Sequence, residues 1–216
     1  PKCSTEVFSQ DSQQLSAGDV IATISGPARN ILTAERTALN LLQHMSGIST
    51  QTARYVTEIS GTNAQLIDTR KTTPGLRILE KHAVICGGGR NHRLGLDNGL
   101  LIKDNHIAVC GGLEKAIKKA KENVPVLVKV EVECDRLDQV AEALQAGADM
   151  LLLDNMDLAS LTEAVKMVNH QMPLEASGGV TLETIGDIAR TGVDFISVGR
   201  ITQSSPAVDI GLDEQL

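Results

Sequence analysis

Aromatic side chains are almost absent from this sequence, which has no Trp, one Tyr and two Phe among 216 residues. Proteins that bind single-stranded nucleic acid usually stack bases on such rings and hold the phosphates on a basic surface. The formal net charge of −7 gives the chain as a whole no basic field of that kind. These two absences argue against nucleic acid as a partner.

Long apolar runs are also missing. No stretch approaches the ~20 residues that a membrane-spanning helix needs. No positively charged segment followed by an apolar run and small residues precedes the first helical pattern, so there is no support for export. We therefore expect no membrane partner and a cytoplasmic location.

Paired cysteine motifs and nucleotide-binding motifs are absent as well. The four cysteines are scattered without a CxxC pair, which argues against a structural zinc site and a disulfide framework and favours buried or idle thiols. Gly87-Gly88-Gly89 lacks the GxGxxG spacing, and there is no P-loop. His92 and His106 have basic neighbours that would repel a cation, so we expect hydrogen-bonding roles for them.

A concentrated basic segment stands out against this background. Residues 68–107 hold seven Lys and Arg, three of the five His and four Asp and Glu, giving this segment a net charge of +3 and the rest of the chain −10. The basic residues lie beside Thr, Gly and Pro, in turn-forming contexts, whereas a solvated helix face would mix Lys with Glu at helical spacing. The segment predicts a site for a small, multiply charged anion, with a solvated basic loop as the alternative.

Helical and strand-like patterns alternate from about residue 33 onward. Thr33 can cap a helix over residues 34–59, which ends at Gly61. The expected strands span residues 64–68, 99–103, 126–133, 150–154, 173–177 and 194–198, and the helices between them span 113–122, 137–145, 158–170 and 182–190. Gly147 and Gly192 fall where residues that follow helix ends belong. This alternation predicts parallel strands and an α/β fold.

Each expected strand ends in polar or glycine residues, as if all strands faced one shared site. This favours an open or incomplete α/β barrel over a doubly wound sheet, which remains the alternative because such a sheet gathers ligands at one switch point. Residues 1–32 break the pattern and read as the remnant of an N-terminal α/β sandwich domain. The barrel is assigned to residues 33–206, and residues 207–216 to a segment that returns to the N-terminal domain.

Three of these strand ends indicate chemistry. In the KVEVE run, Lys129, Glu131 and Glu133 share one face, which in a barrel points inward, where charges need partners or a polar ligand. Glu133 is the better ligand candidate because it lies nearer the strand end, and an exposed edge strand is the alternative. Glycine turns at residues 177–179 and at Gly199 follow successive strands and can cradle phosphate through backbone N–H groups.

Seven segments together resemble the nicotinate-nucleotide pyrophosphorylase family, also called quinolinate phosphoribosyltransferase (decarboxylating). They are ERTALN (35–40), DTRKTTPGLR (68–77), GGGRNHRLGL (87–96), LIKDNHI (101–107), KVEVE (129–133), LLLDN (151–155) and ASGGV (176–180). The resemblance covers the chain from about residue 33 to its C-terminus. The front departs from the family pattern, because members carry a further N-terminal domain of which only the last strand or two stand here.

The resemblance implies transfer of phosphoribosyl from phosphoribosyl pyrophosphate to the nitrogen of quinolinate, with loss of carbon dioxide. It implies that quinolinate is held by Arg36, Arg70, His92 and Arg93, with Lys71 and Lys103 around the dicarboxylate and the leaving pyrophosphate. Glu133 and Asp154 match carboxylates for the ribose hydroxyls and for a Mg²⁺-linked diphosphate, and Ser177, Gly178, Gly179 and Gly199 match phosphate loops. The implied catalytic residues are Lys71, Lys103, Glu133 and Asp154.

The arginine that matches Arg36 reaches a neighbouring subunit's site in the family, which implies a homodimer with shared active sites. Two other functions stay open at the level of sequence. One is a different phosphate-handling α/β-barrel enzyme, and the other is a non-catalytic anion-binding fragment.

Overall fold

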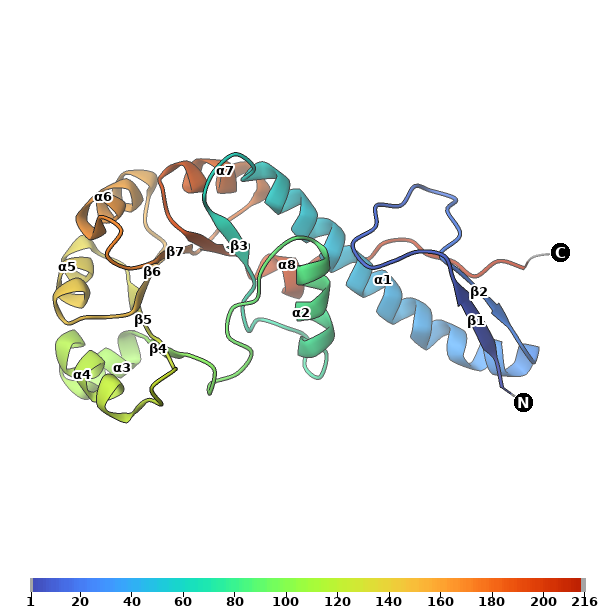
Figure 1. Cartoon of the computed structure of the whole chain (residues 1–216), viewed down its shortest axis with the longest axis horizontal. Coiled ribbons are helices and arrows are strands. Elements are labelled where there is room, and N and C mark those ends of the chain that lie inside the picture. The colour runs from blue at the N-terminus through green and yellow to red at the C-terminus, as the bar shows by residue number, and fades with distance from the viewer. Residues whose placement is uncertain (1, 215–216) are drawn as a thin grey trace.

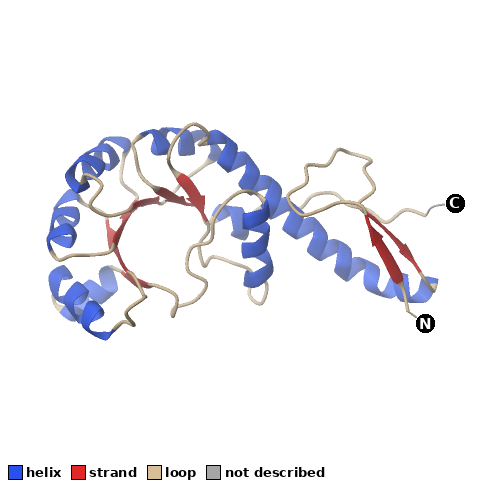
Figure 2. Ribbon diagram, in the orientation of Figure 1, coloured by secondary structure: helices blue, strands red, loops and turns tan. Residues whose placement is uncertain are grey.

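Six parallel strands form the inner layer of the main part of the molecule, which the computed structural model describes from residue 2 to residue 214. The sheet has the order β3-β8-β7-β6-β5-β4. Its strands are β3 (Gln65–Ile67), β4 (Leu100–Ile102), β5 (Val130–Cys134), β6 (Met150–Asp154), β7 (Leu174–Ser177) and β8 (Phe195–Ser197). The strands line the inside of a curve, and the helices cover its outside (Figures 1 and 2).

The outer layer follows the βα alternation. Its helices are α2 (Arg77–Cys86), α3 (Asp104–Cys110), α4 (Leu113–Asn123), α5 (Leu137–Gln145), α6 (Leu158–Val168), α7 (Leu182–Arg190) and α8 (Arg200–Gln203). Among the described residues, β3 and β4 are not paired with each other, and an isolated bridge between Ile67 and Arg90 extends the β3 edge. The sheet is therefore an open barrel, as the strand endings predicted.

Alternation along the strands separates an apolar outer face from a polar inner face. Val130 and Val132 of β5 are fully buried in the core against the helices. Glu131, which lies between them, and Glu175 of β7 point to the other face, at 6% and 1% exposure. The exposed-edge alternative for β5 is excluded because this strand pairs with both β4 and β6. Buried charge on the inner face has to be paired, and that requirement shapes the site.

A separate two-stranded unit precedes the barrel. β1 (Ser4–Val7) and β2 (Ala22–Ser25) form an antiparallel pair, and α1 (Ala28–Glu58) runs from this pair to the barrel (Figure 1). The C-terminal segment crosses α1, where Val208 N donates to Gln43 O (3.1 Å) and Gln43 Nε2 donates to Ile210 O (2.7 Å). The domain boundaries given above stay a prediction.

Three local expectations were wrong. α1 begins at Ala28, because Pro27 has the φ of −61° suited to a helix start, and Thr33 bonds back to Arg29 O inside the helix. The strand expected from residue 126 begins at Val130, because Pro125 to Val128 form a turn. Lys129 consequently lies exposed outside the strand.

The short helix α3 was not predicted from the sequence. It follows β4 directly, where only a polar strand ending was expected.

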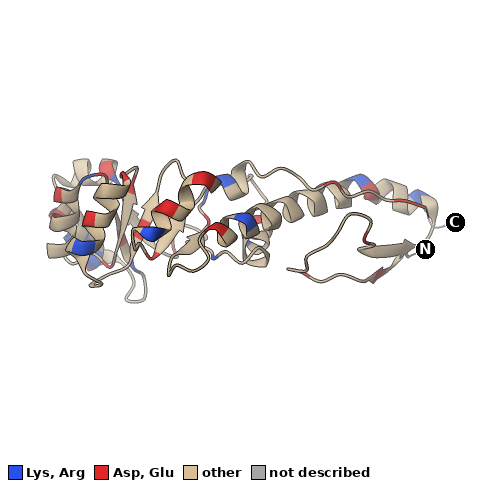
Figure 3. Ribbon diagram, turned by 90° about the horizontal axis from the view of Figure 1, so that it is seen from above, with Lys and Arg blue, Asp and Glu red and all other residues tan. Residues whose placement is uncertain are grey.

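Charged residues of both signs are spread along the fold. Viewed from above, acidic and basic positions intermingle along the barrel helices and α1 (Figure 3). No helix in the described part of the chain combines the length and apolar character needed to cross a bilayer.

Candidate functional site

His92 lies between two carboxylates on the inner face of the barrel. Its Nε2 is 3.0 Å from Glu131 Oε2 and 3.3 Å from Glu175 Oε2. Burial by itself lowers the pKa of His92, but hydrogen bonding and charge from these two carboxylates outweigh it and raise the pKa to about 9. The ring is therefore a cation at neutral pH, and the hydrogen-bonding role predicted for His92 is confirmed.

The two carboxylates themselves are short of hydrogen-bond donors. Glu131 Oε1 is buried and accepts no hydrogen bond from the residues that the structure describes, and Glu175 Oε2, also buried, has the 3.3 Å ion pair with His92 but no hydrogen bond of good geometry from those residues. Burial raises the pKa of Glu175, and the negative charge of Glu131 adds to this effect. Since unpaired buried oxygens are costly, the cationic His92 is the group that offsets them.

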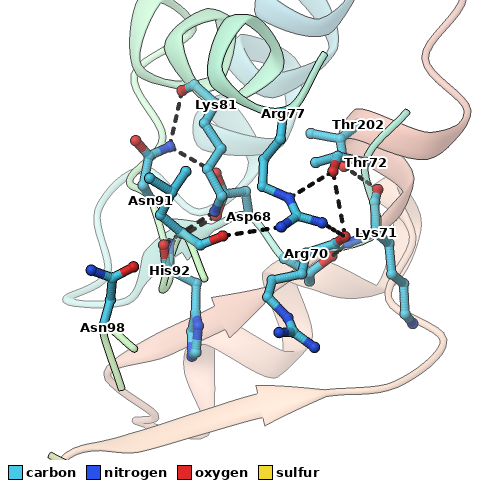
Figure 4. A network of polar contacts seen from close by, with 12 residues as sticks. Asp68, Arg70, Lys71, Thr72, Arg77, Lys81, Asn91, His92, Asn98 and Thr202 are labelled. Atoms are coloured by element: carbon cyan, nitrogen blue, oxygen red, sulfur yellow. Dashed lines mark hydrogen bonds and ion pairs between the residues drawn. The ribbon is translucent and has the colours of Figure 1, made fainter. Parts of the chain in front are cut away.

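A buried ion pair holds the backbone of His92 in place. Lys81 donates to the Asp68 carboxylate and to His92 O (3.1 Å), and Asp68 Oδ1 accepts from His92 N (2.8 Å) (Figure 4). Asn91 Nδ2 donates to Asp68 Oδ2 at 2.7 Å. Burial raises the pKa of Asp68, although the Lys81 ammonium and these donors oppose the rise. The network joins β3, α2 and the loop that carries His92.

Arg77 organises the loop that follows β3. Its guanidinium donates to Thr72 Oγ1 (3.0 Å), Arg70 O (3.4 Å) and Leu94 O (3.2 Å). In Figure 4 the side chains of Arg70 and His92 extend in the same direction, toward the sheet. A planar guanidinium with several donors can tie two loops together in this way, whereas a single ammonium cannot.

Arg93 completes a cluster of cations with Arg70 and His92. Arg93 Nη1 donates to Gly99 O at 2.8 Å. Burial and then the positive charge of Arg70 lower the pKa of Arg93, while Glu131 and Glu175 oppose this shift. Cations held together at a half-buried position repel one another, so the cluster favours an anion between them. The predicted grouping of these three residues is thus present.

Carboxylates occupy the neighbouring strand ends. Glu133 forms an ion pair with Lys103, which follows β4. Asp154 ends β6 in register with Ser177 of β7, and its Oδ2 accepts from Asn155 Nδ2 (2.7 Å). Carboxyl ends of parallel strands open onto one edge of the sheet, which places these groups beside the cation cluster.

Two glycine loops reach this edge, and the backbone requires glycine at Gly178. A Cβ on Gly178, whose φ is +99°, would lie 2.1 Å from Asn155 Oδ1, and one on Gly199 would lie 2.9 Å from Lys71 Cδ. Thr202 Oγ1 donates to Lys71 O (2.8 Å), which anchors the β3 loop to α8. Gly179 also has a positive φ, of +60°. The loops predicted to cradle phosphate therefore lie close to Lys71 and Asp154.

Arg36 is the one predicted site residue that lies apart from the others. It lies in the N-terminal part of α1, and its side chain is 69% exposed. α1 first meets α2 at His44, whose Nε2 is 2.8 Å from Glu80 Oε1. Eight residues of helix separate Arg36 from His44, or about 12 Å at 1.5 Å per residue. Its own chain brings Arg36 to none of the groups described above.

Asp68, Lys81 and Glu175 had been given no role in the site. Glu175 carried a usable signal, because it is a charged residue in an otherwise apolar strand and alternation places it inward with Ser177. Lys81 carried none, since a lysine in an amphipathic helix ordinarily faces solvent.

Two parts of the site have the chemistry to hold a cation. The ligand atoms of His92, Glu131 and Glu175 lie within 4.8 Å of one another. The raised pKa of His92 favours a proton there, because histidine binds a metal only in its neutral form. The oxygen donors of Glu133 and Asp154 suit a hard cation such as Mg²⁺.

The protonation of His92 leads to a prediction about stability. A group whose pKa is raised from about 6.5 to about 9 on folding stabilises the protein fully below pH 6.5 and loses that effect as the pH rises through 9. The contribution is of order 3 kcal/mol, since each pKa unit is worth about 1.4 kcal/mol. We expect His92→Gln to remove this pH dependence from the free energy of unfolding in urea. His170→Asn, at an exposed position with φ +60°, should retain it, and equal slopes in all three proteins would contradict the assignment.

Two protein-family models match this chain, one after the other. Residues 48–213 match the family described as quinolinate phosphoribosyl transferase, C-terminal domain, and residues 1–46 match the corresponding N-terminal domain. The two matches meet inside α1.

Individual relatives agree with the family matches. The chain is 45% identical over 207 residues to the probable nicotinate-nucleotide pyrophosphorylase (carboxylating) of Bacillus subtilis, covering 96% of this chain and 72% of that protein. The human enzyme of that name is 38% identical, covering 97% and 72% respectively. A crystal structure of nicotinate-nucleotide pyrophosphorylase from Ehrlichia chaffeensis superposes with a TM-score of 0.94 at 43% identity, covering 98% of this chain and 77% of that one. The chain therefore belongs to the quinolinate phosphoribosyl transferase family.

Proposed function

We propose that this protein transfers the phosphoribosyl group of phosphoribosyl pyrophosphate to the ring nitrogen of quinolinate, giving nicotinate mononucleotide, pyrophosphate and carbon dioxide. The observation that carries the proposal is the cluster of the cations Arg70, His92 and Arg93 on the inner face of the sheet, with the carboxylates Glu133 and Asp154 at the C-terminal ends of β5 and β6 of the same sheet. The relatives' name, which ends in "carboxylating", describes the same reaction in the opposite direction.

The cation cluster suits the acceptor. Quinolinate carries two adjacent carboxylates, and Arg forks bind carboxylates in a bidentate manner. The Arg93 guanidinium is held by Gly99 O, and the contact of Arg77 with the Arg70 carbonyl holds the backbone of Arg70. The Arg93 fork is therefore preorganised in part before the dicarboxylate binds.

The carboxylates and loops suit the donor. Breaking the bond between ribose C1 and pyrophosphate leaves positive charge on the sugar and negative charge on the leaving group. Glu133 and Asp154 stabilise the sugar side and bind its hydroxyls, while Lys71, Lys103 and the loops at Ser177, Gly178, Gly179 and Gly199 receive the phosphates. Once ribosylated, the ring is cationic and stabilises the electron pair that departing carbon dioxide leaves on the ring carbon, which then takes up a proton from water. No protein nucleophile is needed.

The donor set at the sheet edge also supports Mg²⁺ as the cofactor. Glu133 and Asp154 would hold it, directly or through water and the substrate diphosphate, and when bound it neutralises charge on the leaving group. Lys103 forms an ion pair with the same Glu133 carboxylate and keeps it oriented.

The function is tested by chromatographic detection of nicotinate mononucleotide from quinolinate and phosphoribosyl pyrophosphate, with carbon dioxide released in equal amount. Formation of a different product, or binding of both compounds without turnover, would contradict the proposal. The first result would point to another phosphate-handling barrel enzyme, and the second to a binding protein.

Removal of the metal gives a separate expectation. Because charge on pyrophosphate is otherwise neutralised only by lysines and loop N–H groups, EDTA should abolish turnover and excess Mg²⁺ should restore it. Product formation undiminished by EDTA would show that the diphosphate needs no metal.

We further infer a homodimer in which Arg36 of each subunit serves the other's site. The 69% exposure of the Arg36 side chain and its position about 12 Å along α1 from His44, where that helix meets α2, support this arrangement. Mixing Arg36→Ala with Glu133→Ala would then create one site with both lesions and one with neither. Two-fold symmetry predicts recovery of up to about half the wild-type rate per heterodimer. If heterodimers form and recover nothing, Arg36 acts within its own chain.

A further inference from the structure

A second cluster of ligand-type side chains lies on the outer surface of α2. His82 Nε2 is 2.9 Å from Asp11 Oδ2 and 3.5 Å from Cys86 Sγ. The three ligand atoms all lie within 4.8 Å of one another. His82 and Cys86 are four residues apart on the helix and so share a face, and Asp11 comes from the loop between β1 and β2, 71 positions away in the sequence.

We propose that Asp11, His82 and Cys86 form a binding site for a zinc-class divalent cation, with water at the fourth position. One carboxylate, one imidazole and one thiolate are the three side-chain types that Zn²⁺ uses in proteins. With bonds of about 2.0–2.3 Å, ligand atoms at the corners of a tetrahedron lie roughly 3.5 Å apart. The two separations from His82 Nε2, 2.9 and 3.5 Å, lie within about 0.6 Å of that value and need only small side-chain movements.

The placement of this cluster separates it from the site at the strand ends. The barrel-facing side of α2 carries Lys81 and Glu80, which are buried, whereas His82 is 63% exposed. Arg77, which organises the β3 loop, begins the helix, and Cys86 ends it. Binding a cation here would displace the Cys86 thiol proton to solvent and touch none of the residues assigned to phosphoribosyl transfer.

The structural consequence would be attachment of the β1–β2 loop to the barrel. Within the loop, the hydrogen bonds are local, such as Gln13 N to Gln10 O (3.1 Å) and Ser16 N to Asp19 Oδ2 (2.7 Å). The contact of Asp11 with His82 joins the loop to α2. A metal held by both would close a long loop between the N-terminal unit and the barrel, and such closures limit the freedom of the unfolded chain.

Cobalt is the probe for this site, because Co²⁺ adopts the same ligands and reports them by absorption. Wild-type protein titrated with Co²⁺ should develop a thiolate-to-metal charge-transfer band and the visible bands of a tetrahedral ion, and Zn²⁺ should displace it in a ratio of about one per chain. Excess Mg²⁺ should not compete, because thiolate and imidazole are poor ligands for it.

Single substitutions of the three residues test which side chains bind the metal. Cys86→Ser should lose the charge-transfer band, and His82→Asn and Asp11→Asn should each weaken Zn²⁺ binding at least about tenfold, since changes even outside the first ligand shell cost 10–100-fold. Cys3→Ser, which removes an exposed thiol elsewhere in the N-terminal unit, is the matched control and should bind as wild type does. Thermal melts without metal confirm that each variant is folded.

Limited proteolysis of the loop gives a second readout. Zn²⁺ should slow cleavage within residues 8–20 of the wild-type protein but not of Asp11→Asn. The proposal is overturned if wild-type protein with Co²⁺ shows no thiolate band, or if Cys86→Ser binds Zn²⁺ as tightly as Cys3→Ser does. If Asp11→Asn binds Zn²⁺ as tightly as the wild-type protein does, Asp11 is not a ligand, and the proposed three-residue site is wrong.

Discussion

Lys81→Met should destabilise the folded protein by about 3–5 kcal/mol, the usual cost of removing one partner from a buried ion pair. Lys81 and Asp68 are 3% and 0% exposed, so solvent does not screen the loss. The variant leaves the Asp68 carboxylate buried beside Asn91 Nδ2 and His92 N, without its cation. Urea unfolding at constant pH would measure the difference between variant and wild type.

A double variant that removes both partners of the ion pair is the control for the predicted loss of stability. Lys81→Met combined with Asp68→Leu removes both charges and should recover part of the lost stability, because no unpaired charge stays buried. It should not recover activity, since the backbone of His92 loses two of its anchors. A single variant as stable as wild type would mean that the pair contributes little, and a fully active double variant would remove its role in positioning His92.

Arg93→Lys should lower quinolinate use by at least ~10²-fold while retaining the charge. Arg93 already uses one guanidinium nitrogen to hold Gly99 O at 2.8 Å, and the remaining nitrogens of the fork stay available to a carboxylate. A single ammonium cannot hold the loop and fork the ligand at the same time. Steady-state kinetics with quinolinate varied would give kcat/KM, and the melting temperature would confirm folding.

Arg136→Lys serves as the matched control for that experiment. Arg136 is exposed and pairs with Asp135 and Asp138 at the start of α5, and neither partner belongs to the cation cluster. The same exchange there should leave kcat/KM within about twofold, because exposed pairs contribute little. Near-normal kinetics for Arg93→Lys would place the dicarboxylate elsewhere in the barrel.

The inner face of the barrel could be read only in part from the sequence. Glu131 and Glu133 were expected inside because strict alternation in KVEVE puts them on one face of a strand, which a barrel turns inward, with an exposed edge strand as the alternative. Glu175 follows the same rule, but a single charge in a four-residue strand is a weaker signal. The boundaries at Thr33 and Val126 failed because the ends of helices and strands depend on local turns, such as the one from Pro125 to Val128.

The alternation of the six barrel strands with helices, the α/β class and the identity of most charged groups at the site could be predicted from the sequence, because helix and strand periods and turn residues are local properties. Which groups meet depends on the tertiary structure. It buried Lys81 against Asp68, placed His92 between two carboxylates and brought Asp11 to His82, 71 positions away. These contacts join residues from different elements, and their energies depend on burial and distance, which no local pattern records.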